Sequence, residues 1–515
     1  MNGDCFLGID AGTSGVKAVV IDIHGHIRGM GYRECDVINP HPGWAEQNPE
    51  DWWIACDGAV QEAVQKSGCG SAVAGIGLSG QMQGCVLLDR QGEPIGNCII
   101  WLDQRADEET EAINQLGSVK EMLNVGGYCL NSFWAPKLLW IRKHRPADFE
   151  KIDTVMFTKD YLRYRMTGEI ATDVSDASLT FFVDLPKRRW SDKMIDKIGI
   201  PRDILPERLL ESTEPAGRLQ ADLAARWGIR AGTVVAAGAG DQPACGVGSD
   251  VARSGVVGSS IGTSGAVFGC IDHPFVSEKP CAAYSMCHAV PDEWCFLGLS
   301  LTSGASFKWL RDTVFAEKKA EMALKKGDIY GYMTGLAQKA DPGCEGLLFL
   351  PYLNGDKTPN NDKAARGVWF GLSQRHGVNE LCRSVMEGVT FSLRDSLELL
   401  REQGMEVQEV HASGGGAKSS LWRQIQADIF HAPVMTMNVE ESPAAGAAII
   451  AGVAAGVFRN IQEGCDCMIR VTDVTEPIES HAKIYDDYFQ EYRQLYASLK
   501  KNFMDQNRIV QKYSV

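Results

Sequence analysis

Short apolar runs rich in Val and Ile alternate along the chain with stretches in which apolar residues recur at helical spacing. Apolar runs of about 4–8 residues indicate strands, whereas a period of about 3.6 residues indicates helices. The strands expected in the first half lie at residues 5–10, 16–22, 27–32, 73–78, 85–88 and 233–238. The helices expected there lie at residues 50–66, 105–116, 136–144, 158–167 and 220–227. This alternation predicts an α/β layered fold.

The second half repeats this pattern. Strands are expected at residues 255–261, 266–269 and 407–412, and helices at 380–401 and 419–430. The Ala- and Gly-rich stretch at 443–458 is shorter than the roughly 20 residues of a membrane-spanning helix, and it predicts a buried, closely packed helix. A last set of apolar residues recurs at helical spacing and predicts a helix packed on a domain. Its members are Tyr485, Tyr488, Phe489, Tyr492, Leu495, Tyr496 and Leu499.

One tetrapeptide, Gly-Thr-Ser-Gly, occurs at residues 12–15 and again at 262–265, each time between two predicted strands. A strand, a glycine-rich turn and a second strand predict a β-hairpin. The shared flanks indicate a duplicated domain core; a chance match in a chain with 54 glycines is the alternative. A chain of 515 residues is also too long for one ordinary domain. We expect two domains, residues 1–250 and 251–515, joined by a hinge near residues 245–255.

Composition narrows the class of protein. Hydrophobic residues make up 44% and charged residues 23% of the chain, as in soluble globular proteins. The 51 basic and 66 acidic side chains give a net charge of −15, which opposes binding to nucleic acid or to an anionic membrane. The 16 cysteines are scattered without a Cys-x-x-Cys pair, and the first ten residues do not resemble a signal peptide. These features predict a reduced, cytoplasmic protein.

Two short motifs point to other chemistries but lack the context that those chemistries need. Residues 75–80 match the dinucleotide-binding pattern Gly-x-Gly-x-x-Gly, which requires a helix after it, and here a predicted strand follows. Residues 258–262 match the nucleophile-elbow pattern Gly-x-Ser-x-Gly of hydrolases, and here the repeated turn follows instead of a helix. The pattern Gly-x-x-x-x-Gly-Lys-[Ser/Thr] does not occur. An NAD enzyme that uses residues 75–80 stays open as a minor alternative.

A different phosphate-binding arrangement fits the sequence better. The two hairpin turns, one from each half, can face each other across a cleft and offer backbone N–H groups and hydroxyls to phosphates. A third glycine cluster, at residues 413–418, follows a predicted strand and precedes the predicted helix at 419–430. That context suits a nucleotide at a helix start, and a purely structural turn is the alternative.

Two aspartates are candidates for the chemistry. Aligned on the repeated tetrapeptide, Asp10 of the first hairpin corresponds to Ser260 of the second. A carboxylate beside a phosphate-binding turn repels the ligand unless a divalent cation lies between them. Asp10 is therefore a candidate magnesium ligand, with a turn-capping aspartate as the alternative. Asp241 follows a predicted buried strand and can serve as a general base in a cleft, with a helix cap as the alternative.

Several blocks of sequence together resemble the FGGY family of carbohydrate kinases. These blocks are residues 8–17, 77–84, 238–242, 260–265 and 413–417, and the long signature of the family is matched by residues 367–372 and 380–387. Within the family, four further blocks are most similar to the xylulose kinases: residues 43–52, 101–105, 171–178 and 348–352. The resemblance implies two actin-like, ribonuclease-H-like domains that close over ATP, Mg²⁺ and a small-molecule sugar. It also makes a homodimer possible.

The resemblance implies roles for individual residues as well. It makes Asp241 the catalytic base and Asp10 the metal ligand. The substrate contacts that it implies come from Met82, Gln83, Trp101, Asp103 and Gln242. The ATP contacts that it implies come from Thr13, Ser14, Thr263, Gly304, Gly415 and Gly416.

One residue departs from the pattern of the xylulose kinases, which have Met-His-Gly where this chain has Met82-Gln83-Gly84. Glutamine keeps a donor and an acceptor but cannot titrate near neutral pH as histidine does. The expected reaction is transfer of the γ-phosphoryl group of ATP to a terminal hydroxyl of a ketopentose. D-xylulose is the first expectation, and another pentulose or a polyol is the alternative. A non-catalytic actin-like nucleotide switch is a more remote alternative.

Overall fold

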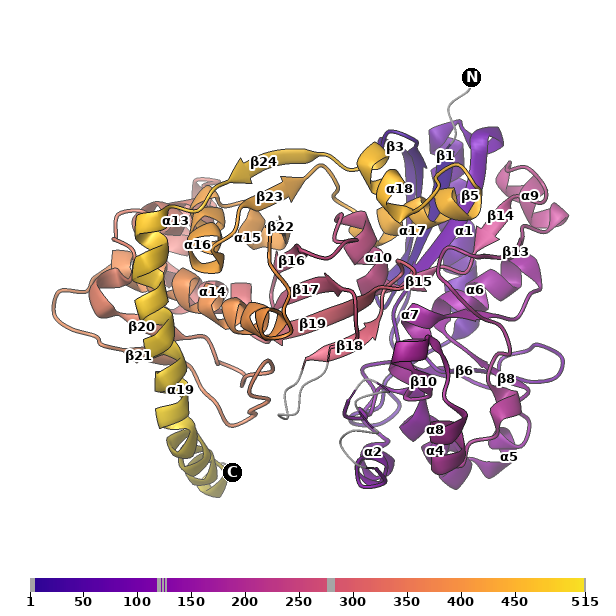
Figure 1. Ribbon diagram of the computed structural model, residues 1–515, viewed down its shortest axis with the longest axis horizontal. Coiled ribbons are helices and arrows are strands. Elements are labelled where there is room, and N and C mark those ends of the chain that lie inside the picture. Colours follow the sequence, from indigo (N-terminus) through magenta and orange to yellow (C-terminus); the bar gives the residue numbers. More distant parts are fainter. Residues whose placement is uncertain (1–4, 118–121, 123–124, 126, 276–282, 514–515) are drawn as a thin grey trace.

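The computed structural model describes residues 5–117, 122, 125, 127–275 and 283–513. Figure 1 shows two halves side by side, each built from a sheet with helices packed against it. Both sheets have seven strands among the described residues. The α/β fold class predicted from the alternation of apolar runs is therefore confirmed.

The sheet of the first half has the strand order β13-β14-β5-β1-β2-β3, and β15 pairs with the end of β5. β1 pairs antiparallel with β2 and parallel with β5, so that the β1–β2 turn and the end of β5 lie at the same edge. The strands are β1 (Cys5–Gly12), β2 (Gly15–Asp22), β3 (Ile27–Glu34), β5 (Val73–Gly80), β13 (Pro215–Arg218), β14 (Val234–Ala236) and β15 (Ala239–Gly240).

The sheet of the second half has the strand order β18-β19-β17-β16-β22-β23-β24. Its strands are β16 (Val256–Ile261), β17 (Gly265–Ile271), β18 (Tyr284–Cys287), β19 (Trp294–Ser300), β22 (Glu409–Ser413), β23 (Val434–Met437) and β24 (Val471–Thr475). Apart from β18 in this sheet and β15 in the first, the strand order and the strand directions of the two sheets match. The duplicated core predicted from the repeated tetrapeptide is therefore confirmed at the level of topology.

The predicted helices are present, and most end within two residues of the expected positions. The helices of the first half include α1 (Pro49–Ser67), α2 (Asp107–Asn114), α4 (Trp134–His144), α6 (Thr158–Thr167) and α9 (Ala221–Trp227), which were expected, and α7 (Val174–Ala177) and α10 (Asp241–Gly248), which were not. In the second half the expected helices are α14 (Val378–Glu402), α16 (Ser420–Phe430), α17 (Ser442–Ala454) and α19 (Glu479–Tyr513). The structure adds α11 (Ser303–Thr313), α12 (Ala316–Leu324), α13 (Ile329–Ala337), α15 (Gly414–Ala417) and α18 (Ile461–Met468), which were not predicted from the sequence.

Short strands connect the loops near the first sheet. β4 (Glu46–Gln47) pairs with β7 (Cys98–Ile99), and β6 (Val86–Leu88) pairs with β8 (Thr154–Met156). The β4–β7 pair lies next to contacts between two of the sequence blocks shared with the xylulose kinases, those at residues 43–52 and 101–105: the Gln104 N–H donates to the Gly43 carbonyl oxygen at 2.8 Å, and the Ala45 N–H donates to Asp103 at 2.6 Å. Both blocks therefore lie together beside the end of β5 at which the chemistry is expected.

Helix α17 belongs to the second half of the sequence but packs on the sheet of the first half (Figure 1). The approach needs glycine, because an added Cβ on Gly8 would lie 1.9 Å from the carbonyl oxygen of Ala444. An added Cβ on Gly77 would lie 1.9 Å from the carbonyl oxygen of Ala447. The glycine pattern at residues 75–80 thus lies inside β5 and admits a helix backbone. Its context, a strand with no helix start at its end, does not favour dinucleotide binding.

Helix α19 closes the second half. Its aromatic residues Tyr485, Phe489 and Tyr492 are buried against Phe391 of α14, which confirms the predicted packing helix. The cysteines of the described residues are free thiols. In the described parts of the chain, none of the helices combines the length and the apolar character that a membrane crossing requires.

Candidate active site

Asp10 lies near the end of β1, where three chain segments meet. The Ser79 hydroxyl, on the neighbouring strand β5, donates a hydrogen bond of 2.9 Å to Oδ1 of Asp10. On the other side, Lys17 of β2 is the cross-strand partner of Asp10 and forms an ion pair of 2.6 Å with Glu441. Glu441 immediately precedes α17, so a carboxylate of the second half lies at the end of the first sheet that carries Asp10.

Asp241 comes to the same edge by a different route. β15 pairs in parallel with the last two residues of β5, and Asp241 follows β15 directly as the first residue of α10. The side chain of Met82 packs so closely here that an added Cβ on Gly240 would lie 2.7 Å from it. Asp10, Met82, Asp241 and the adjacent Gln242 are therefore brought together.

The two aspartates influence each other. Burial raises the pKa of Asp241 to about 7; the negative charge of Asp10 adds to this, and hydrogen bonds from Gln242 act in the opposite direction. Burial also raises the pKa of Asp10, against the hydrogen bond from Ser79 and the charge of Lys17. A carboxyl group poised near neutral pH suits a general base.

A buried ionic cluster fixes the segment that carries Asp241. Arg163 of α6 donates to the carbonyl oxygen of Ala237 at 2.8 Å, and the Gly240 N–H donates to the Ser175 hydroxyl at 3.1 Å. Ser175 in turn donates to Asp173 at 2.5 Å, and Lys159 pairs with Asp173 at 2.8 Å. Sequence reasoning did not find this cluster, because it joins groups that lie as many as 74 residues apart in the sequence.

The turn of the first hairpin is tied to the loops beside it. The Thr13 hydroxyl accepts a hydrogen bond from Nε1 of Trp101 at 2.9 Å and donates one to Oε1 of Gln81 at 3.1 Å. Gln81 also donates to Gln47 at 2.7 Å, and Gln47 donates to the Thr13 carbonyl oxygen at 2.8 Å. Ser14 is exposed at the turn. Thr13 and Trp101 thus meet, although they are implied contacts of different ligands.

Asp103, an implied sugar contact, is 2% exposed and has its oxygens occupied by protein donors. Oδ2 accepts from the Ala45 N–H at 2.6 Å, and both oxygens accept from Arg105, at 2.8 and 2.7 Å. The Arg105 guanidinium lies 3.8 Å from the centre of the Trp44 ring. Asp103 therefore holds the Trp101 loop in place and does not point into open space.

The implied ATP residues of the second half surround one cavity of about 730 Å³. Thr263 comes from the β16–β17 turn and Gly304 from the start of α11, and Gly415 and Gly416 come from α15. The Gly304 N–H donates to the Gly262 carbonyl oxygen at 2.8 Å, and an added Cβ on Gly304 would lie 2.2 Å from that oxygen. Aromatic side chains, including Tyr330 and Trp422, form part of the wall, as suits a planar base.

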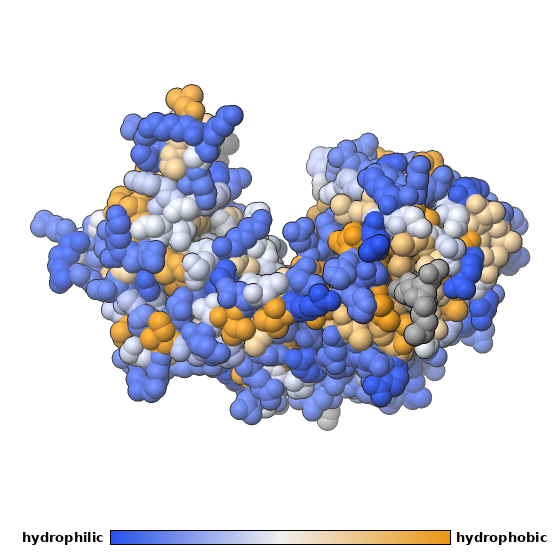
Figure 2. Space-filling view, turned by 90° about the horizontal axis from the view of Figure 1, so that it is seen from above, coloured by the Kyte–Doolittle hydropathy of each residue, from blue (hydrophilic) through white to orange (hydrophobic). Residues whose placement is uncertain are grey.

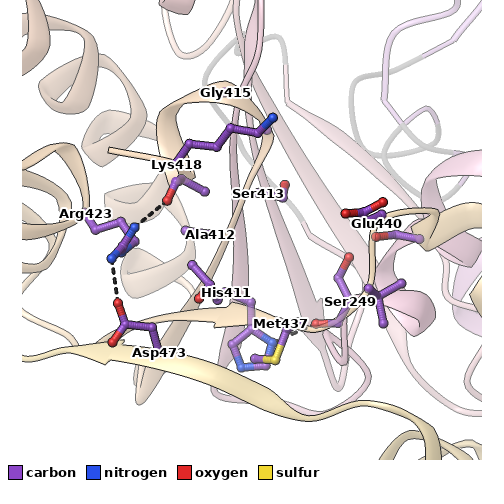
Figure 3. Close-up of a pocket in the computed structure, with 15 residues that line it drawn as sticks. Ser249, His411, Ala412, Ser413, Gly415, Lys418, Arg423, Met437, Glu440 and Asp473 are labelled. Atoms are coloured by element: carbon purple, nitrogen blue, oxygen red, sulfur yellow. Dashed lines mark hydrogen bonds and ion pairs between the residues drawn. The ribbon is translucent and has the colours of Figure 1, made fainter. Parts of the chain in front are cut away.

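A second cavity, of about 700 Å³, borders the same β22–α15 turn (Figure 3). Arg423 donates to the carbonyl oxygen of Ala417 at 2.7 Å, and Figure 3 shows Arg423 paired with Asp473. Ser249 and Glu440 line the opposite side. These two residues belong to the segments that join the halves, so this cavity lies beside the connections. Figure 2 shows the halves as two lobes with a notch between them.

The residues at Asp10 suit a magnesium ion that is also held by phosphate. The described residues contain no cluster of three His, Cys, Asp or Glu side chains that could form a protein-only metal site. Mg²⁺ is usually bound by one or two carboxylates, with substrate phosphates and water completing the octahedron. A cation beside Asp10 would also offset the smaller part of the increase in the pKa of Asp241, which the charge of Asp10 adds to the effect of burial.

Comparison with known proteins identifies the family of this chain. The N-terminal domain model of the FGGY carbohydrate kinases matches residues 5–248, and the C-terminal domain model matches residues 257–455. Xylulose kinase of Escherichia coli strain K12 is 37% identical over 89% of this chain and 92% of that protein. Among solved structures, xylulose kinase of Rhodospirillum rubrum is 27% identical with a TM-score of 0.88, over 97% of this chain and 100% of that one.

A further solved structure, gluconate kinase of Lactobacillus acidophilus, is 25% identical with a TM-score of 0.86, over 98% of this chain and 100% of that one. The fold is thus shared by kinases of different sugars. Since both domain models match and the relatives align over nearly their whole length, the chain belongs to the FGGY family of carbohydrate kinases and is a sugar kinase.

Proposed function

We propose that this kinase transfers the γ-phosphoryl group of ATP to the terminal hydroxyl of D-xylulose, giving D-xylulose 5-phosphate and ADP. The observation that carries the proposal is the 37% identity to the E. coli xylulose kinase over 92% of that protein. The site geometry supports it, because a carboxyl group lies beside side chains that can contact a sugar at one edge of the first sheet.

In the proposed mechanism, Asp241 accepts the proton of the sugar hydroxyl as the new P–O bond forms and the bond to ADP breaks. Phosphoryl transfer passes through a loose transition state, so catalysis is mainly alignment and charge stabilisation. Met82, Gln83 and Gln242 hold the sugar next to Asp241. The ionic cluster around Arg163 and Asp173 keeps the Asp241 segment rigid.

The nucleotide occupies the cavity lined by Gly304, Gly415 and Gly416, with its phosphates directed to the hairpin turns. Thr263 contributes from one turn, and backbone N–H groups of residues 12–15 contribute from the other. Asp10 would hold a magnesium ion, which when bound would supply positive charge to the phosphate oxygens. Closure of the two halves excludes water and limits hydrolysis of ATP.

The glutamine at position 83, where the xylulose kinases have histidine, supports a second candidate substrate, which is another pentulose or a polyol. If the residue only orients a sugar hydroxyl, glutamine serves as well as the histidine of the xylulose kinases. If the site needs an imidazole, the acceptor differs. A gluconate kinase of the same fold, which is 25% identical, supports the idea that this fold serves more than one acceptor.

The deciding experiment measures ADP release from Mg-ATP with D-xylulose, D-ribulose, xylitol and D-gluconate. We expect the highest kcat/KM with D-xylulose. A higher value with another acceptor would replace the substrate assignment, and ATP turnover independent of any sugar would favour a nucleotide switch. Asp241→Asn tests the base, with an expected loss of roughly 10²–10⁴-fold in kcat at an unchanged KM for ATP.

The position of Gln83 is tested by Gln83→His, which we expect to change the KM for the sugar and its preference among sugars more than the KM for ATP. An equal effect on both substrates would place Gln83 outside the sugar site. We also propose that the enzyme acts in the cytoplasm, in keeping with its ATP-dependent reaction and free thiols. A homodimer remains a prediction.

A further inference from the structure

Lys137 is a buried basic residue to which the proposed mechanism gives no role. It lies on α4 and is 1% exposed. Its ammonium group donates to the carbonyl oxygen of Gln83 at 2.7 Å and to that of Ile99 at 3.1 Å. One charged group therefore joins the chain segment at Gln83 to the segment at Ile99.

The first of these segments is the turn that carries the proposed sugar contact. Gln83 has a backbone φ of 70°, in the left-handed region that favours glycine. Two side chains of α4 bind successive carbonyl groups of this turn. Lys137 donates to that of Gln83, and Nε1 of Trp134 donates to that of Gly84 at 2.8 Å. Lys137 and Trp134 are three residues apart and so lie on one face of the helix. The unusual backbone of Gln83 is thus stabilised from outside the turn.

The second segment leads to Trp101, which the resemblance to the FGGY kinases implies as a sugar contact. Ile99 ends β7, and Trp101 follows two residues later. The indole of Trp101 is 43% exposed and reaches Thr13 of the first hairpin. Lys137 therefore fixes the position of the Gln83 turn relative to the segment that carries Trp101.

The surroundings of Lys137 make a mere packing role unfavourable. Burial lowers the pKa of Lys137 to about 8, and the nearby Cys85, Cys98 and Asp103 only partly offset this effect. An apolar side chain of similar length would fill the same space without the cost of burying an ammonium group. Such a residue would leave two buried carbonyl groups without this donor.

We propose that Lys137 is a positioning residue for the acceptor sugar: by binding the carbonyl groups of Gln83 and Ile99 together, it sets the geometry of the sugar pocket and hence sugar affinity and selectivity. This inference rests on the proposed function, because it takes Gln83 and Trp101 as sugar contacts. Lys137 itself does not touch the sugar.

The test compares Lys137→Met with Lys143→Met. Lys143 lies on the same helix with a side chain 54% exposed, and it pairs with Glu108 at the surface. For Lys137→Met we expect at least a 10-fold increase in the KM for the sugar, less than a 2-fold change in the KM for ATP, and a reduced preference between D-xylulose and D-ribulose. Lys143→Met is expected to match the wild type. A change in neither KM, or an equal change in both, would overturn the proposal.

A second variant covers the case in which Lys137→Met does not fold. Lys137→Gln is shorter by one bond and offers two neutral N–H donors in place of three charged ones, so it binds the two carbonyl groups more weakly and we expect an increase of about 3- to 10-fold in the KM for the sugar alone. An unchanged sugar KM in this variant, or an equal change in both KM values, would overturn the proposal too. If the wild type accepts no ketopentose, the proposed function fails, and the positioning role is then measured by calorimetric binding of whichever sugar the wild type accepts.

Discussion

Single residues in this protein show how burial decides the behaviour of a carboxyl group. Asp395 of α14 is 6% exposed, and burial raises its pKa to about 8. The charges of Asp356 and Glu398 add to this increase, and those of Arg493 and Arg394 oppose it. Asp486 of α19 shows the reverse, because Arg394 and His431 bind it and its pKa is lowered.

The raised pKa of Asp395 predicts how stability depends on pH. In the folded state Asp395 keeps its proton up to about pH 8, whereas in the unfolded chain it loses the proton near pH 4. Between these two pH values, unfolding therefore releases a proton. The free energy of unfolding consequently falls as the pH rises from about 4 to about 8. Asp395→Asn removes the effect. We expect this variant to unfold at a higher temperature than the wild type at pH 8 and at nearly the same temperature at pH 5.

The matched control for that measurement is Asp486→Asn. The carboxylate of Asp486 is stabilised in the folded state, so its neutral replacement should lower the unfolding temperature at pH 8. If Asp395→Asn unfolds at the same temperature as the wild type at pH 8, Asp395 is ionised in the folded protein without loss of stability.

Thr13 gives a prediction that separates two roles for one hydroxyl. Its single hydrogen is donated to Gln81, which is 1% exposed, so it is not available to a phosphate while that bond holds. Thr13→Val keeps the shape but leaves the Gln81 oxygen unpaired, whereas Thr13→Ser keeps the hydroxyl. We expect Thr13→Val to lower kcat/KM for the sugar about 10-fold or more, and Thr13→Ser to stay within about 3-fold of the wild type.

The measurement that checks this is the KM for each substrate in both variants. A role in holding the Trp101 loop raises the KM for the sugar most. If Thr13→Val instead raises the KM for ATP alone, the hydroxyl exchanges Gln81 for a phosphate oxygen when the nucleotide binds, and its side chain is a direct ATP contact.

At the scale of elements, the contact between α17 and the first sheet depends on glycines. An added Cβ on Gly77 would overlap the carbonyl oxygen of Ala447, which is backbone and cannot rotate away. Overpacking of this kind costs roughly 1–3 kcal/mol or more. We therefore expect Gly77→Ala to lower the unfolding temperature by several degrees, as measured by calorimetry.

Gly335→Ala is the control for this prediction. Gly335 lies in α13, and an added Cβ there would meet no heavy atom within 4 Å. Alanine is the better helix former, so the control should be neutral or slightly stabilising. Equal unfolding temperatures for the two variants would mean that α17 can shift away from β5 at little cost.

The sequence predicted these elements well but not their long-range partners. Periodicity and turn residues placed the hairpins at residues 12–15 and 262–265, because these signals are local. The small residues of 443–458 indicated close packing, but nothing local states that the partner is a strand more than 350 residues earlier. Lys137 was missed for the same reason, since a lysine in a helix with apolar neighbours usually lies at the surface. The roles of the site residues were implied by family resemblance and stay proposals.

At the scale of the whole molecule, α17 belongs to the second half of the sequence but is part of the packing of the first half. Residues 1–250 were expected to form one domain, and they do contain all the strands of the first sheet. The face of this sheet formed by β1 and β5 is nevertheless covered by α17, which also packs on α10. At the helix contact an added Cβ on Gly446 would lie 1.9 Å from the carbonyl oxygen of Ala244. The two halves therefore share one packed layer.

This shared layer predicts that the two halves are not independent in stability. Residues 1–250 expressed alone would expose the apolar face that Ile449, Ile450 and Phe458 cover in the full chain, so we expect no cooperative thermal unfolding and a tendency to aggregate. Adding a second segment, residues 251–515, should restore a soluble complex, because it returns α17. A fragment 1–250 that unfolded cooperatively near the temperature of the full chain would show instead that the sheet is stable without α17. Closure of the cleft would then be a motion between two halves that are each stable alone, and the contact of α17 with the first sheet would not be needed for the stability of that sheet.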